Sequence, residues 1–288
     1  ICQLNTGRLN SNPFQTLSAL VNRDDTDRFI GSGTLKWAAY TSARNSVQLS
    51  AIGGVDRYNQ DLVSYLPNFI QNEGADGFRG RSVQGSGEAS LLNSSLNAVW
   101  TFTPANGWFE STTSAGLQAE QRYNNTFYVR ARGLLPGTDY VNQGNQQTAQ
   151  ARVDVRDQAA YAQQQFVIKD RWLIGGRIRG ERSSVNADRS QLYYFPAVSS
   201  SYRLEKPLPM VDEFKVRAAI GTSGNQPRYG DRDLTFNALG IVGGQNAVGT
   251  ATQLGNPSIK PEKMTENEYG FDASFLNKRL SLEGTYFN

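Results

Sequence analysis

The sequence of 288 residues contains no histidine and one cysteine, Cys2. Without histidine, Ser-His-Asp catalysis, Cys-His catalysis and metal sites that need imidazole are excluded. A single cysteine cannot form an intrachain disulfide. The net charge of +3, without any basic run, gives no reason to expect a nucleic-acid partner. These absences exclude only histidine-dependent sites. Separately, we expect no enzymatic activity, no cofactor and no resident metal.

Long hydrophobic runs are also missing, since no stretch of roughly 18 apolar residues occurs, and a transmembrane helix is not expected. A strand can cross a membrane with about 10 residues and shows lipid only every second one, so the mean hydropathy of -0.52 does not exclude a membrane protein. The chain begins at Ile1 without a signal peptide. For an exported protein, this predicts a mature or truncated segment.

What the sequence does contain is alternation with a period of two, which is typical of β-strands with two different faces. In the first such stretch Phe29, Leu35 and Trp37 share one face, while Arg28 and Lys36 share the other. The pattern predicts about ten strands. They are expected at residues 27–40, 46–58, 88–103, 108–123, 151–168, 172–182, 191–204, 214–222, 264–275 and 279–287.

The connections between these stretches are alternately short and long. Short ones are expected at residues 41–45, 104–107, 169–171, 205–213 and 276–278, and long polar ones at residues 59–87, 124–150, 183–190 and 223–263. Tight turns at one end and large loops at the other are typical of an outer-membrane β-barrel wall. A soluble β-sandwich or propeller is the main rival, but its strands are shorter, and no fixed repeat is present.

Aromatic residues gather near the short connections, where a girdle at the membrane–water interface is favoured over ordinary packing at a sheet end. The residues expected in this girdle are Trp37, Tyr40, Trp100, Trp108 and Trp172. Phe102, Phe109 and Phe166 lie near the same connections. This arrangement predicts short turns on the periplasmic side and long loops outside.

A second group of aromatic residues lies in or beside the expected long loops, among Asn, Gln and Arg. Stacking surfaces with such neighbours suit sugars or peptides, although packing within the loops explains any single residue equally well. The candidate substrate-binding residues are Tyr58, Tyr65, Phe69, Tyr123, Phe127 and Tyr128, with Tyr140 nearby.

Acidic residues also gather in the expected loops: Asp24, Asp25 and Asp27; Glu73 and Asp76; Asp231 and Asp233. The first cluster lacks the spacing and glycine of a calcium loop, so a solvated turn is favoured over a cation site. Nothing fixes the separation of any carboxylate pair, which leaves a glycosidase only a remote alternative.

Four segments resemble motifs of TonB-dependent transporters, specifically the SusC/RagA branch. They are residues 179–184 (RGERSS), 194–204 (YFPAVSSSYRL), 214–226 (FKVRAAIGTSGNQ) and 255–263 (GNPSIKPEK), the last followed by Glu268 and Gly270. Glu181 stands where the family usually has aspartate. Residues 9–31 also resemble this branch, and the resemblance is weakest over residues 59–150.

The resemblance implies an all-β chain that forms part of a large antiparallel transmembrane β-barrel of about 22 strands. It implies active import of oligosaccharides or peptides across a bacterial outer membrane, with TonB, a SusD-like lipoprotein and outer-membrane lipid as partners. Residues 1–288 would be a partial barrel domain without the plug, ending in mid-barrel, and TonB would act through an N-terminal segment outside this sequence. The alternatives are a siderophore or vitamin receptor of the same fold, and a structural or adhesive surface protein.

Overall fold

The computed structural model describes residues 13–70, 77–250 and 254–288, apart from the side chain of Asn237. Cys2, Glu73 and Asp76 lie outside the described residues. So does the start of the N-terminal segment that resembles the transporter branch. None of the helices within the described residues is long and apolar enough to cross a membrane.

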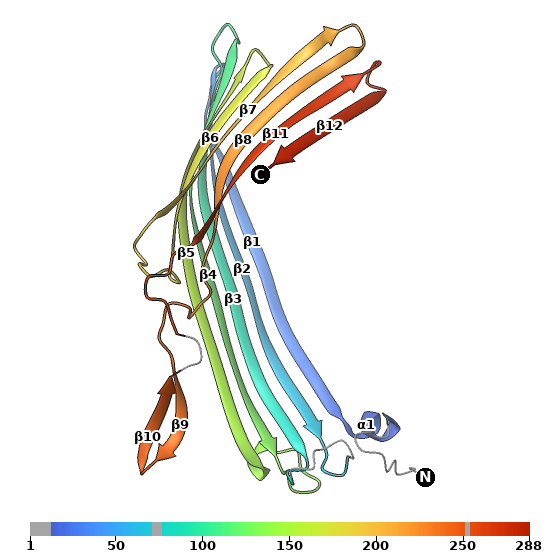
Figure 1. Ribbon diagram of the computed structural model, residues 1–288, viewed down its shortest axis with the longest axis vertical. Coiled ribbons are helices and arrows are strands. Elements are labelled where there is room, and N and C mark those ends of the chain that lie inside the picture. The colour runs from blue at the N-terminus through green and yellow to red at the C-terminus, as the bar shows by residue number, and fades with distance from the viewer. Residues whose placement is uncertain (1–12, 71–76, 251–253) are drawn as a thin grey trace. The chain divides into compact units, whose positions relative to one another are not determined.

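Ten strands form one sheet in the order β1-β2-β3-β4-β5-β6-β7-β8-β11-β12 (Figure 1). Every stretch predicted from alternation is confirmed as a strand of this sheet, and neighbours in the sheet follow one another in the chain. The strands are β1 (Val21–Thr41), β2 (Asn45–Leu66), β3 (Arg81–Phe102), β4 (Phe109–Arg132), β5 (Asn145–Ile168), β6 (Trp172–Ser183), β7 (Tyr193–Leu208), β8 (Val211–Asn225), β11 (Glu262–Phe275) and β12 (Leu280–Phe287).

The first strands are longer than predicted, so two expected loops are corrected. The connection predicted at residues 59–87 covers only 67–80, and the one predicted at 124–150 covers only 133–144. The strands continue there because polar side chains pair across them: Gln60 Nε2 donates to Asp24 Oδ2 at 2.8 Å, and Gln150 Nε2 donates to Asn125 Oδ1 at 3.0 Å. Because polar and apolar residues are mixed on both faces there, the alternation that marks a strand in the sequence disappears.

Four short elements were not predicted. They are α1 (Pro13–Ala19), the 3-10 turn η1 (Val141–Gln143), and the hairpin of β9 (Phe236–Val242) and β10 (Gln245–Thr250), which forms a separate two-stranded sheet. Gly243 and Gly244 make the turn of this hairpin with φ of 60° and 81°. Two adjacent glycines between β-rich segments favour a hairpin turn. The prediction of one long loop over residues 223–263 missed this hairpin.

Two of the short turns contain non-glycine residues with positive φ, in the left-handed region. Lys169 and Asp170 join β5 to β6 with φ of 49° and 54°, and Leu276, Asn277 and Lys278 join β11 to β12 with φ of 56–61°. Such residues match the right-handed twist of the strands they connect, which lets a hairpin close in very few residues.

By its contacts the chain divides into two compact units. One holds the described parts of Ile1–Gly31, Gly54–Leu92 and Gln121–Asp154, and the other holds Ser32–Gly53, Asn93–Glu120 and the described parts of Val155–Asn288. Within the first unit Leu66, Ile70, Ala131 and Leu134 are buried, and within the second Val155, Val185, Tyr193, Phe195 and Ala273. Most large apolar side chains of the strands are instead exposed, among them Leu35, Leu117 and Ile220.

The register within the second unit separates the residues of β5, β6, β7, β8 and β11 into polar and apolar rows. One row across the strands reads Gln163, Arg177, Ala197, Gly221 and Glu266. A row of the opposite face reads Ile168, Trp172, Tyr202, Val216 and Phe271. Because successive side chains of a strand point to opposite faces, this sheet has one polar and one apolar side.

Gly116 on β4 is a position where the sheet tolerates no side chain. A Cβ there would lie 2.8 Å from the backbone oxygen of Leu96 and 2.5 Å from Cε1 of Tyr161. The Tyr161 hydroxyl donates to Asn97 Oδ1 at 2.8 Å, which holds its ring over the glycine. We expect Gly116→Ala to lower the free energy of unfolding by about 1–3 kcal/mol.

The measurement is the temperature at which the folded β-sheet species is lost in a gel-shift assay of heated samples. Gly53→Ala is the matched control, because a Cβ at Gly53 meets nothing within 4 Å. Equal midpoints for the two variants would contradict the expectation.

Candidate functional site: a polar groove on the sheet

The aromatic residues predicted to bind substrate lie mainly on strands, which corrects the expected loop position of Tyr65, Phe127 and Tyr128. Tyr58 and Tyr65 belong to β2, Tyr123, Phe127 and Tyr128 belong to β4, and only Phe69 lies in a connection. Alternation along each strand separates Tyr58 from Tyr65 and Phe127 from Tyr128, so these side chains do not form one stacking platform. Their role in substrate binding stays a prediction.

The aromatic residues predicted as a girdle are brought together in part. Ring centroids lie 6.4 Å apart for Trp100 and Phe102, 5.9 Å for Phe102 and Phe109, and 4.5 Å for Trp108 and Phe109. Trp172 lies 6.4 Å from Tyr202.

Two of these tryptophans also have polar partners. Trp100 Nε1 donates to Asn45 Oδ1 at 3.0 Å, and Trp172 Nε1 donates to Ser200 Oγ at 2.9 Å. Trp37 and Tyr40 lie near the end of β1, three residues apart, and alternation places them on opposite faces. Amphipathic rings with their N–H groups satisfied suit a boundary between apolar and polar surroundings.

Three acidic residues of the predicted clusters have partners among their neighbours. Asp24 accepts from Gln60, Asp25 pairs with Arg23 at 2.9 Å, and Asp233 pairs with Arg232 at 3.1 Å. Across the described ranges, no three Cys, Asp or Glu side chains lie together in a way that could hold a metal ion.

The polar side of β5, β6, β7, β8 and β11 contains an open groove of about 430 Å³. Its floor is made of small residues on three central strands, namely Gly175, Ala197, Ser199, Ala219 and Gly221. Long polar side chains in the same rows stand around these small residues, which leaves a hollow above the floor. Those side chains are Gln163 and Gln165 on β5, Arg177 on β6, and Glu266 and Glu268 on β11.

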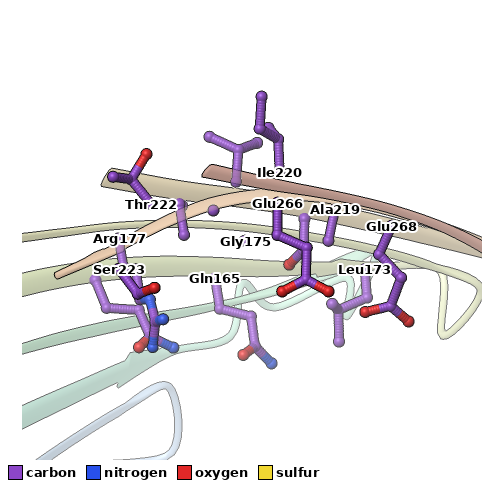
Figure 2. Close-up of a pocket in the computed structure, with 16 residues that line it drawn as sticks. Gln165, Leu173, Gly175, Arg177, Ala219, Ile220, Thr222, Ser223, Glu266 and Glu268 are labelled. Carbon is purple, nitrogen blue, oxygen red and sulfur yellow. The ribbon is translucent and has the colours of Figure 1, made fainter. Parts of the chain in front are cut away.

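Figure 2 shows that the long polar side chains of the groove point to one side of the sheet. Gln165, Arg177, Glu266 and Glu268 extend in the same direction, while Ile220 extends to the other side. The cation on β6 and the carboxylates on β11 are separated by β7 and β8, so the groove presents opposite charges at its two walls.

The charges at the two walls differ in how well they are neutralised. Within the described residues, neither Arg177 nor Glu266 has an ion pair or a side-chain hydrogen bond. Glu268 Oε1 lies 3.7 Å from Nε of Arg217 and is partly compensated. Arg177 and Glu266 are therefore available to a ligand that offers an anionic or accepting group at one end and a donating group at the other.

A ladder of ion pairs lies beside the groove and centres on Arg217 of β8. Its guanidinium bonds to Asp272, to Glu283 Oε1 at 3.0 Å and to Thr285 Oγ1 at 2.5 Å. Gly270 leaves room for this arrangement, since a Cβ there would lie 2.6 Å from Arg217 Nε. The Glu268 and Gly270 of the transporter-like motif thus have distinct positions: one lines the groove and the other accommodates Arg217.

Sequence reasoning missed the groove because its residues are scattered along more than 100 positions of the chain. Gln163, Arg177, Glu266 and Glu268 each look like an ordinary polar residue of an alternating strand. The register between strands is the signal that brings them together.

We expect Arg217→Met to reduce stability, because Asp272, Glu283 and Glu268 would be left near one another without their common cation. The cost should be observed as a lower temperature of sheet loss. Lys215→Met is the control: its Nζ lies 3.4 Å from Asp272 and is partly exposed, so this substitution should lower the temperature of sheet loss less than Arg217→Met does. An equal effect of the two substitutions would contradict the central role of Arg217.

Comparison with known proteins gives a consistent picture. The sequence profile of the family described as "TonB dependent receptor-like, beta-barrel" matches residues 3–288. TonB-dependent receptor P26 of Formosa agariphila is 26% identical over 130 residues, which cover 42% of this chain and 13% of that protein. TonB-dependent receptor P39 of the same organism is 27% identical over 129 residues, covering 42% and 12%.

Among solved structures, the RagAB peptide transporter is similar with a TM-score of 0.80 and 15% identity, covering 94% of this chain and 30% of the solved chain. Its "open-open" state gives a TM-score of 0.78 with the same coverage. The chain thus spans less than a third of the length of these relatives, and at this identity the likeness shows the fold alone. Because the family profile matches almost every residue, this chain belongs to the TonB dependent receptor-like β-barrel family.

Proposed function

We propose that this chain is a section of the wall of a bacterial outer-membrane transporter that imports oligosaccharides or peptides with energy delivered through TonB. The observation that carries the proposal is the two-sided sheet. One side carries exposed apolar residues that end in aromatic rings at the short turns, and the other carries a groove lined by amides and charges. In a transporter barrel, the first side faces lipid and the second faces the lumen.

The dimensions of the apolar side support the membrane placement. On β6 the outward residues run from Trp172 through Ile174 and Ile178 to Arg182, a span of about ten residues. A strand of about 9–11 residues crosses the hydrocarbon core when tilted. An aromatic ring bounds this span at one end and a charged side chain at the other.

The side chains that line the groove favour an oligosaccharide or a peptide as the ligand. Oligosaccharides and peptides offer many donors and acceptors, which the amides of Gln163 and Gln165 and the charges of Arg177 and Glu266 can bind. The similar fold of a peptide transporter favours the same kind of cargo. Tyr58, Tyr65, Phe69, Tyr123, Phe127 and Tyr128 stay candidates for earlier contacts nearer the long connections.

The partners follow from the SusC/RagA resemblance. A SusD-like lipoprotein would bind near the long connections, and TonB would act through a segment outside this sequence. Transport, not catalysis, is then the activity, and the residues of the groove bind and guide a ligand without forming or breaking its bonds.

Uptake by cells tests the proposal. In the complete gene product, we expect the pair of substitutions Arg177→Gln and Glu266→Gln to reduce uptake of a labelled oligopeptide or oligosaccharide mixture about tenfold or more, because both charged contacts are lost. Ala218→Leu on the apolar side is the control and should transport normally. Abundance in the outer-membrane fraction must be equal for all variants.

Two results would overturn the proposal. Recovery of the natural protein as a water-soluble monomer would reject the membrane placement. Unchanged uptake of both classes of ligand by the double variant would reject the groove as part of the transport path.

A further inference from the structure

The apolar side of the second unit is not uniform but contains a trough. A hollow of about 850 Å³ crosses β1 to β5, and its base consists of the small residues Gly33, Ala51, Gly53, Ala119 and Ala160. Leu35, Leu96 and Leu117 form its apolar wall and are 77%, 58% and 58% exposed. Side chains this apolar and this exposed require a covering partner in the folded protein.

The trough continues along the strands toward the aromatic end. A second hollow of about 820 Å³ shares Leu35, Leu96 and Leu117 with the first and extends to Trp37, Leu49 and Ala98. Small residues under a continuous apolar channel fit a flexible hydrocarbon chain, which needs volume and contact but no specific polar partner.

The opposite end of the trough is polar and positively charged. Arg182 lines the hollow together with Gln158 and Ser190. Its Nε and Nη2 both donate to Gln158 Oε1, at 2.9 and 2.5 Å. This bond to a neutral amide orients the guanidinium but leaves its charge unbalanced, and none of the described carboxylates forms an ion pair with Arg182.

The acidic residue of the adjoining loop does not take the role of a counter-ion. Asp188 accepts from Ser190 N at 2.8 Å and from Ser190 Oγ at 2.6 Å, and these hydrogen bonds lower the pKa of its carboxyl group below the usual value. Asp188 is thus hydrogen-bonded within its own turn and does not pair with Arg182. Arg182 remains a cation with free donors at the mouth of an apolar trough.

We propose that this trough is a binding site for one phosphate-bearing anionic membrane lipid, with the phosphate on Arg182 and an acyl chain lying over the small residues toward Trp37. Guanidinium is the side chain best suited to a phosphate oxygen pair, and the apolar channel begins directly beside it. The occupant must therefore combine an anionic head with a hydrocarbon tail. The inference rests on the proposed membrane placement of the sheet.

Native mass spectrometry of the complete gene product, purified in a neutral detergent, tests the site. Phosphatidylglycerol is added in steps, with zwitterionic phosphatidylcholine and inorganic phosphate as separate probes. We expect one tightly bound phosphatidylglycerol, at least about tenfold weaker binding of the other two probes, and a similar loss for Arg182→Gln. Filling the trough with Ala119→Leu and Ala160→Leu should also release the lipid.

Matched controls separate this site from general effects. Arg203→Gln removes an arginine that pairs with Glu205 outside the trough, and Ala218→Leu enlarges an apolar-side residue on β8. Both should keep the lipid. Recovery of every variant in the outer-membrane fraction is scored separately, so that failure of the membrane placement is distinguishable from failure of the lipid site.

Several outcomes would overturn the inference. Equal binding of phosphatidylglycerol and phosphatidylcholine by the natural protein would show ordinary lipid contact, and this comparison holds even if a variant fails to fold. Inorganic phosphate binding as tightly as the lipid would show an anion site alone. Loss of a protein dimer on filling the trough, without loss of lipid, would assign the surface to a second copy of the chain.

Discussion

Backbone pairing between antiparallel neighbours determines which side chains stand next to one another, and every functional feature of this protein depends on that register. Across β5 to β11 it places Arg177 in line with Ala197, Gly221 and Glu266, and it places Trp172 in line with Tyr202 and Val216 on the other side. A slip of one residue in any strand would exchange these faces and put charge among apolar side chains.

The two faces use small residues for different purposes. On the polar side, Gly175 and Gly221 open a groove between unneutralised charges, and Gly270 lets Arg217 reach three acidic groups. On the apolar side, Gly53 and Ala160 lie at the base of a trough that ends at Arg182. A sheet otherwise presents a corrugated surface, and hollows of useful size arise where several neighbouring strands carry small side chains in the same rows.

β2 and β3 are longer than hydrophobic periodicity predicts, and they extend into the region expected to be a loop. Beyond Tyr58 on β2 and before Glu88 on β3, both faces carry polar residues, and Gln60 of this part of β2 bonds to Asp24 of β1. A polar strand is indistinguishable by hydrophobic periodicity from a polar loop. For that reason periodicity alone assigns Tyr65, Phe127 and Tyr128 to loops, although all three lie on strands.

The sequence by itself determined the ten strands, their chain order and the family, because alternation and turn chemistry are local properties and motifs survive in short segments. It also indicated the aromatic cluster at the short turns. Only the tertiary structure decided the groove of Arg177 and Glu266, the ladder around Arg217 and the trough beside Arg182. Each joins residues of several strands, and the strand register that unites them is set by cooperative pairing across the sheet, not by any local pattern.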